Sequence, residues 1–176
     1  MKLFDSYRTA QLYTDFLERY ARPGEKHSWQ QVNDQVRLTT AQRELLQSFT
    51  RQMPVLCLAG TWCPDCYGQC PIFEHFAAIL PLIQVRYLDR DDHPDVQQQL
   101  QINGGNRVPS LVFFSEDGFE TARYGERTLS KYRQLGGRPT SGNSLLADVT
   151  QDWLNEFERV HWILRLSPRL RQLHRD

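Results

Sequence analysis

Two cysteines separated by two residues, Cys63 and Cys66, are the side chains with the clearest chemistry in this sequence. They follow a short apolar run, 55–59, and precede a helical pattern. A cysteine at a helix N-terminus is activated because the unpaired N–H groups and the helix dipole stabilise its thiolate. The thiolate is the nucleophile in disulfide exchange. We therefore predict that Cys63 is the exposed nucleophile and that Cys66, one turn later and more buried, resolves the mixed disulfide.

All four cysteines of the 176-residue chain lie between positions 57 and 70. A disulfide scaffold would spread its cysteines along the chain to join distant loops, so a structural framework is excluded. What remains is redox chemistry, metal binding or packed thiols. Cys57 lies in an apolar run, and we predict a buried thiol there. Cys70 is predicted to be a semi-buried helix residue; its alternative is a third redox thiol that pairs with Cys66 or forms a regulatory disulfide.

A metal site is the main alternative to redox chemistry. Cys63, Cys66 and Cys70 would supply three zinc ligands, and His75 is a candidate fourth. However, His75 lies nine positions beyond Cys66, which turns it away from that helical face, and the chain has no second CxxC pair. We therefore predict no metal ligand set and no bound cofactor.

Composition excludes several classes of partner. Apolar residues make up 40% of the chain, which indicates a globular protein, and 21 basic residues balance 21 acidic ones. A nucleic-acid binder would normally carry a cationic excess, so no nucleic acid is expected. No apolar run approaches the roughly 18 residues of a membrane span, and the first residues turn polar at once. The expectation is a cytoplasmic protein that does not bind a membrane.

The elements that must position the two cysteines begin with N-terminal helices. The first has an apolar stripe at helical spacing, with Asp5 or Ser6 as its N-cap, and segment 22–24 ends it. A second, short helix is expected around Trp29. The apolar stripe of the first helix consists of Tyr13, Phe16, Leu17 and Tyr20. We expect Tyr13, Phe16 and Trp29 to be packing residues, with a substrate groove as the alternative.

A third helix begins at a capping box formed by Thr39 and Gln42, continues to Met53 and ends at Pro54. The pattern then changes to alternating strands and helices. Strands are expected at 55–59, 83–88, 110–114 and 119–124; helices are expected at 66–80, 94–100 and 145–166; a loop is expected at 135–143. This order indicates two parallel βαβ units followed by an antiparallel hairpin, in a mixed sheet covered by helices on both faces.

Three features together resemble the thioredoxin superfamily. They are the segment Trp62-Cys63-Pro64-Asp65-Cys66, the helix-kinking Pro71 eight positions after the first cysteine, and Val108-Pro109-Ser110 before an apolar strand. The resemblance implies that Pro109 is cis and lies beside the two sulfurs. It also implies that Val108 offers backbone groups to a substrate peptide as an extra strand. Trp62, Pro64, Val108 and Pro109 are therefore the predicted substrate-binding residues.

The sequence departs from the family pattern at two positions. The cysteines enclose Pro64-Asp65, where thioredoxins have Gly-Pro, and the negative charge of Asp65 is expected to oppose thiolate formation. Cys57 stands six positions before Cys63, where thioredoxins hold a buried aspartate used in proton transfer. We hypothesise that Asp65 takes over this role, which makes Asp65 a third predicted catalytic residue.

The sequence thus predicts a thioredoxin-like α/β fold of three layers, with an N-terminal helical extension (1–53), a thioredoxin-like domain (54–166) and a basic C-terminal tail (167–176). The predicted function is that of a thiol-disulfide oxidoreductase. Its partners would be a protein or small-molecule disulfide and an unidentified electron donor. The alternatives are a zinc-binding protein and a redox-inactive adaptor that captures peptides at the Pro109 edge.

Overall fold

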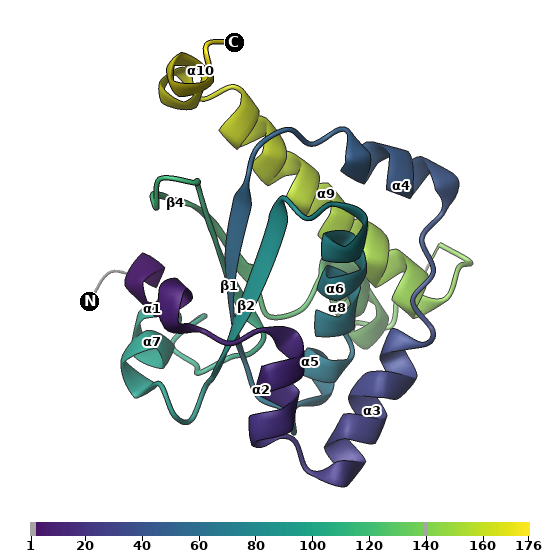
Figure 1. Cartoon of the computed structure of the whole chain (residues 1–176). Helices are drawn as coiled ribbons and strands as arrows, with labels where there is room; N and C mark the ends of the chain where they lie inside the picture. The colour runs from purple at the N-terminus through teal and green to yellow at the C-terminus, as the bar shows by residue number, and fades with distance from the viewer. Residues whose placement is uncertain (1–2, 139–140) are drawn as a thin grey trace.

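The computed structural model describes residues 3–138 and 141–176. Figure 1 shows the strands at the centre of the molecule with helices around them. None of the helices in the described residues is long and apolar enough to cross a membrane. The elements are α1 (Leu3–Thr9), α2 (Tyr13–Tyr20), α3 (Pro23–Asn33), α4 (Thr40–Gln47), β1 (Met53–Ala59), α5 (Pro64–Tyr67), α6 (Cys70–Ile79), β2 (Ile83–Asp89), α7 (Pro94–Gln99), β3 (Ser110–Phe114), β4 (Glu120–Gly125), α8 (Leu129–Leu135), α9 (Leu145–Arg165) and α10 (Pro168–His174).

The four strands form one mixed sheet in the order β2-β1-β3-β4. β1 and β2 are parallel, whereas β3 is antiparallel to both β1 and β4. The prediction of a second parallel βαβ unit is therefore wrong. The register gives the reason: Ala59 pairs with Asp89 and Leu58 pairs with Ser110. β3 thus begins at the end of the sheet where β1 and β2 finish, because the short α7 and its loop stay at that end.

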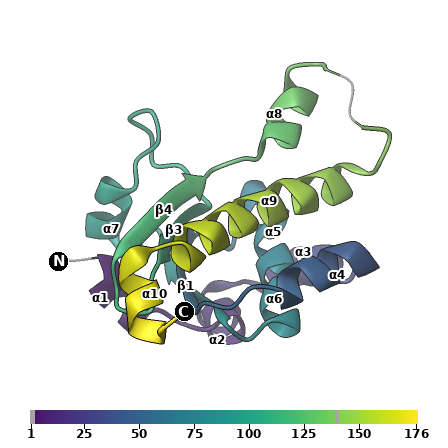
Figure 2. The ribbon, with the colours of Figure 1, turned by 90° about the horizontal axis from the view of Figure 1, so that it is seen from above.

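Helices cover both faces of the sheet, as predicted. Successive strand residues point to opposite faces, and β3 shows this at Phe113 and Phe114. The Phe113 ring lies 5.1 Å from that of Phe157 on α9, while the Phe114 ring lies 5.2 Å from that of Phe4 on α1. Figures 1 and 2 show α6 and α9 on one side of the strands and α1 on the other. The predicted three-layer fold class is confirmed.

The N-terminal helices pack directly on the sheet. Gln11 pairs with the outer edge of β2 through two backbone hydrogen bonds to Tyr87, of 3.0 and 2.7 Å. The rings of Tyr13 and Phe16 on α2 lie 5.7 and 5.5 Å from that of Tyr87. Trp29 on α3 is fully buried in the same aromatic cluster. These side chains are packing residues, as predicted.

Several predicted helix boundaries are wrong. Asp5 and Ser6 lie inside the separate helix α1, and Leu12 is the N-cap of α2. The Thr39–Gln42 capping box is confirmed, but its helix ends at Gln47, and Pro54 lies inside β1. Pro54 is tolerated because it is the second residue of β1 and lies outside the part of the strand, Val55–Leu58, that pairs with β3.

The expected helix 66–80 is divided into α5 and α6, and Pro71 lies in the first turn of α6 instead of kinking a continuous helix. Helix α8 was not predicted; it buries none of its side chains, and its apolar residues Leu129, Tyr132 and Leu135 are exposed. The C-terminal tail forms α10, which buries Leu170. The tail is also held by an ion pair of 2.5 Å between Arg51 and Asp176.

Candidate functional site

The turn after β1 places Cys63 at the start of a helix. Cys63 is the N-cap of α5, and its carbonyl accepts hydrogen bonds from the Cys66 and Tyr67 N–H groups at 3.0 and 3.1 Å. Cys63 retains 7% of its exposure, whereas Cys66 retains none. Cys66 is the more buried of the two, as the sequence predicted, but Cys63 is itself largely buried and not exposed as expected.

The cis proline loop lies against the first cysteine. The Val108–Pro109 peptide is cis, as the resemblance implied. The Cys63 thiol donates a hydrogen bond of 3.7 Å to the Val108 carbonyl, and the Gly60 N–H donates one of 3.4 Å to Cys66 Sγ. The antiparallel course of β3 brings this loop to the end of β1. One end of the sheet thus brings together Cys63, Cys66, Val108 and Pro109.

The two thiols titrate as a pair. Burial raises the pKa of the Cys66 thiol, but its hydrogen-bonding contacts with the Cys63 and Cys70 thiols and with the Gly60 N–H outweigh burial and lower it to about 5. The contact with Cys66 raises the pKa of Cys63, and burial raises it further. The negative charge is therefore favoured on the buried Cys66 and not on Cys63, which corrects the expectation that the helix start stabilises the Cys63 thiolate.

Asp65 forms an ion pair that the sequence did not reveal. Its Oδ2 lies 2.8 Å from Arg127 Nη2 and accepts a hydrogen bond of 3.0 Å from Arg127 Nε. Arg127 follows the last strand, 62 residues away. The guanidinium therefore offsets the carboxylate charge beside the thiols, a charge that raises the pKa of Cys66. The hypothesis that Asp65 carries protons for the thiols stays a prediction.

The charge pair gives a matched test in two variants. Asp65→Asn removes the negative charge, so the first thiol titration of the pair is expected to shift to lower pH by about half a unit. Arg127→Gln leaves the carboxylate uncompensated and is expected to shift the titration upward by a similar amount. The measurement is the rate of Cys63 alkylation by iodoacetamide as a function of pH. A profile and a disulfide-exchange rate unchanged in Asp65→Asn would contradict a proton-carrying role for Asp65.

Gln69 joins the elements behind the cysteines. Its side-chain amide donates hydrogen bonds to the Asp65 and Glu126 carbonyls at 2.9 and 2.8 Å and accepts one of 2.9 Å from the Trp153 indole. Both Gln69 and Trp153 are buried. This network fixes α5 relative to β4 and α9. Sequence reasoning missed Gln69, since a single glutamine in a helical pattern carries no motif.

Trp62 forms the exposed rim of the site. Its side chain is 46% exposed, and the Arg90 guanidinium lies 4.7 Å from the ring centroid. The ring also lies on Gly60, where a Cβ atom would come within 2.9 Å of the indole. Glycine at position 60 therefore permits the indole to lie across the turn. The predicted role of Trp62 in contacting substrate stays a prediction.

The N-terminal helices hold the turn that carries Cys63. The Trp29 indole donates a hydrogen bond of 2.8 Å to the Thr61 carbonyl. The Thr61 hydroxyl donates to Glu25 Oε2 at 2.9 Å and lies 3.3 Å from the Tyr20 carbonyl. Helices α2 and α3 thus position residue 61, two residues before Cys63. Only the apolar character of Trp29 was visible in the sequence, and its partner was not.

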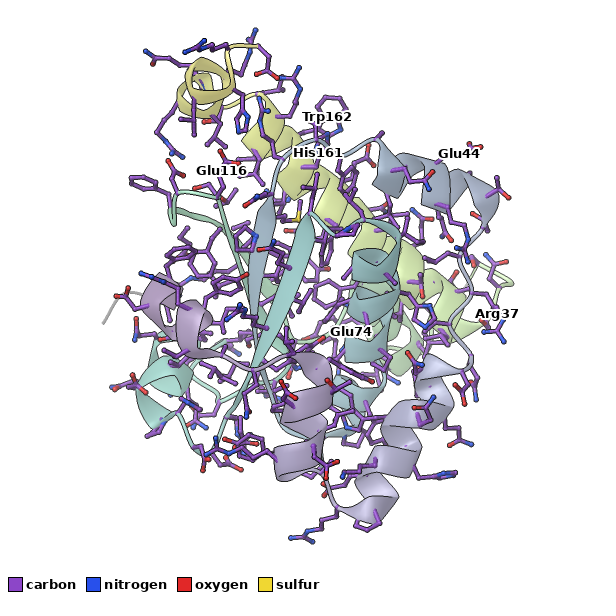
Figure 3. The ribbon with its side chains drawn as sticks, viewed as in Figure 1. Arg37, Glu44, Glu74, Glu116, His161 and Trp162 are labelled. Atoms are coloured by element: carbon purple, nitrogen blue, oxygen red, sulfur yellow. The ribbon has the colours of Figure 1, made fainter. Side chains whose placement is uncertain are left out.

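A half-buried carboxyl lies behind the cysteines. Glu74 on α6, labelled in Figure 3, accepts a hydrogen bond of 2.7 Å from the Tyr87 hydroxyl on β2. Burial raises the pKa of Glu74 to about 7, although the Tyr87 hydrogen bond acts in the opposite direction. Position 57, where the resemblance to thioredoxins implies a buried acid, holds Cys57. Glu74 is therefore an acid of this interior that the family pattern did not predict.

The raised pKa of Glu74 predicts a pH-dependent stability. Between pH 4.5 and about 7 the unfolded chain releases a proton that the folded chain retains, so stability falls as pH rises through this window, by about 3 kcal/mol. Glu74→Gln is expected to remove this loss and to be more stable than the wild type at pH 8. The measurement is urea unfolding at pH 5 and pH 8, with exposed Glu44→Gln as control. Equal pH dependence in Glu74→Gln and the wild type would contradict the prediction.

The zinc alternative finds no support in the geometry. Within residues 3–138 and 141–176, no three histidine, cysteine, aspartate or glutamate side chains converge as a metal ligand set. His75 turns away from the cysteines, and its Nε2 lies 3.1 Å from the Asn33 carbonyl.

A cavity of about 240 Å³ borders the site on the α5 side. Its walls include Val32, Pro64, Asp65, Leu146 and Val149, from α3, α5 and α9. This places an apolar surface next to Pro64, one of the predicted substrate-binding residues.

Comparisons with known proteins agree with this geometry. A family model described as Thioredoxin matches residues 11–132. Among solved structures, a Pseudomonas aeruginosa protein of unknown function is 18% identical, with a TM-score of 0.75 over 91% of this chain and 96% of that one. An HIV epitope-scaffold is 16% identical, with a TM-score of 0.69 over 95% of this chain and 99% of that one. At these identities the structures show the fold alone. No match is found among curated proteins.

Proposed function

The chain belongs to the thioredoxin family, and from that premise we propose that it is a thiol-disulfide oxidoreductase acting through Cys63 and Cys66. One observation carries the proposal: an accessible cysteine at a helix start, one turn before a fully buried one, lies against a cis proline loop. Disulfide exchange needs a nucleophilic thiol that the substrate can contact and a second, sheltered thiol that can attack the mixed disulfide. This arrangement supplies both.

The proposed reaction has two steps. The Cys63 thiolate attacks one sulfur of the substrate disulfide, forming a mixed disulfide and releasing the other sulfur as a thiolate, which takes up a proton. Cys66 then loses its proton and attacks Cys63 Sγ. The mixed disulfide breaks, the second substrate sulfur leaves as a thiol, and a Cys63–Cys66 disulfide forms. A dithiol donor returns two electrons and two protons to the pair.

The surroundings of Cys63 favour an extended peptide as substrate. The Val108 carbonyl already accepts a hydrogen bond from Cys63, and a peptide pairing with this backbone would bring its own sulfur to the same place. The exposed Trp62 and the apolar walls of the cavity beside Pro64 offer apolar contact near Cys63. We therefore propose protein disulfides as the preferred substrate class. The cytoplasm, which keeps thiols reduced, suits this role.

The proposal is tested by catalysis with an artificial donor. The wild-type chain should accelerate the reduction of a disulfide-linked fluorescent peptide by dithiothreitol, and a peptide disulfide should be reduced faster than a small aromatic disulfide. If the peptide is bound without being reduced, the chain is a peptide-binding adaptor and the redox proposal is wrong. If neither substrate is reduced or bound, both the oxidoreductase proposal and the peptide-binding alternative are wrong.

A further inference from the structure

The interior behind the redox pair holds two more thiols in mutual contact. Cys57 on β1 and Cys70, the first residue of α6, have their sulfur atoms 3.8 Å apart. Both side chains are fully buried. A disulfide requires a separation of about 2.05 Å, so a movement of less than about 2 Å joins the sulfurs. This pair is outside the CxxC motif, and the proposed catalytic steps do not use it.

Cys66 connects the buried thiols with the site. Cys63 is the N-cap of α5, Cys66 lies one turn later in α5, and Cys70 begins α6 four positions further along. Along this course, and across the contact between Cys70 and Cys57, the four thiols form the series Cys63, Cys66, Cys70, Cys57, of which only Cys63 retains any exposure. A soluble oxidant has no direct access to Cys57 or Cys70. A disulfide between them must arrive from Cys63 by exchange along this series.

We propose that Cys57 and Cys70 form a second, internal redox pair, which takes over the disulfide of Cys63 and Cys66 by exchange through Cys66. The proposal rests on the proposed function, because substrate reduction supplies the first disulfide. The chain then carries four electrons for substrate reduction instead of two.

The transfer takes two exchange steps. Cys70, as a thiolate, attacks Cys66 Sγ; the Cys63–Cys66 bond breaks, a Cys66–Cys70 bond forms, and Cys63 leaves with the electron pair. Cys57, as a thiolate, then attacks Cys70 Sγ; the Cys66–Cys70 bond breaks, a Cys57–Cys70 bond forms, and Cys66 leaves. Two protons lost by Cys57 and Cys70 are matched by two taken up at Cys63 and Cys66. No outside oxidant or reductant enters these steps.

Burial makes the internal transfer slow. It raises the pKa of both the Cys57 and the Cys70 thiol, so few of these groups are thiolates at neutral pH. We expect the second disulfide to form well after the first and faster at higher pH, because only the thiolate attacks.

The test counts disulfides in the folded chain. The wild type is incubated with excess oxidised peptide disulfide at pH 8, quenched with acid, unfolded and alkylated, and its disulfides are mapped by peptide mass spectrometry. The expected result is two disulfides per chain, Cys63–Cys66 and Cys57–Cys70, the second appearing later. The variants Cys57→Ala and Cys70→Ala, tested separately, should each form only one disulfide per chain. Cys63→Ser should keep Cys57 and Cys70 reduced while folded.

The outcomes separate this proposal from the proposed function. If the wild type forms the Cys63–Cys66 disulfide while Cys57 and Cys70 stay reduced and are fully alkylated, the proposal of an internal pair is wrong. The proposed function is then unaffected. A Cys57–Cys70 disulfide that forms equally fast in Cys63→Ser also overturns it, because the route would not pass through the site. Failure to form any disulfide in the wild type contradicts the proposed function itself.

Discussion

Replacing Cys63 by serine is expected to abolish disulfide reduction, with a rate loss of about a thousandfold or more. A serine hydroxyl is not ionised near neutral pH and forms no bond with a substrate sulfur. Cys66 cannot substitute, because it is fully buried. The measurement is the reduction of the fluorescent peptide disulfide by dithiothreitol at fixed protein concentration.

The fold should survive this substitution, which makes the comparison direct. A serine hydroxyl is smaller than the thiol and can still donate to the Val108 carbonyl, which Cys63 contacts at 3.7 Å. The unfolding midpoint is therefore expected to change by only a few degrees. A Cys63→Ser protein that is folded and retains a tenth or more of the wild-type rate would show that another group is the nucleophile.

Removing the Trp29 side chain is expected to have the largest effect on stability. Trp29 is fully buried among Tyr13 and Phe16, and its indole donates to the Thr61 carbonyl. Trp29→Ala leaves a large cavity and should cost about 4 kcal/mol of unfolding free energy. The measurement is the urea midpoint of unfolding.

Trp29→Phe separates packing from the hydrogen bond. Phenylalanine retains most of the aromatic contact but leaves the Thr61 carbonyl without its partner, at a cost of about 1–3 kcal/mol. We expect a lower rate of Cys63 alkylation and a higher peptide KM in this variant, since the turn at residue 61 is less firmly held. Leu12→Ala, at a side chain 56% exposed, is the control. If Trp29→Phe loses stability while its alkylation rate and KM stay at wild-type values, α3 does not position the site.

The sequence predicted the parts of the site that depend on short-range patterns. Cys63, Cys66 and the turn before them form one local motif, in which helix geometry decides which thiol is accessible. The prediction that Pro109 lies beside the two sulfurs was implied by a family resemblance. Its position in the structure depends on the direction of β3. That direction was predicted wrongly, because strand register is set by contacts between residues far apart in the chain.

The contacts that support the site could not be predicted for the same reason. Gln69, Arg127 and Trp29 act through hydrogen bonds or ion pairs to partners between 32 and 84 residues away. No spacing rule marks such pairs. The contact between Cys57 and Cys70 joins a strand to a helix start in the same way, so the sequence showed two separate cysteines where the structure has a pair.

The central claim is that Cys63 attacks a substrate disulfide and Cys66 resolves the product. It is tested most directly by Cys66→Ser, incubated with an excess of oxidised peptide disulfide and analysed by intact and peptide mass spectrometry. The account predicts one peptide per chain, attached at Cys63, that persists after the wild type has released its own. A folded Cys66→Ser chain that carries no adduct, or carries it at a cysteine other than Cys63, would contradict the account.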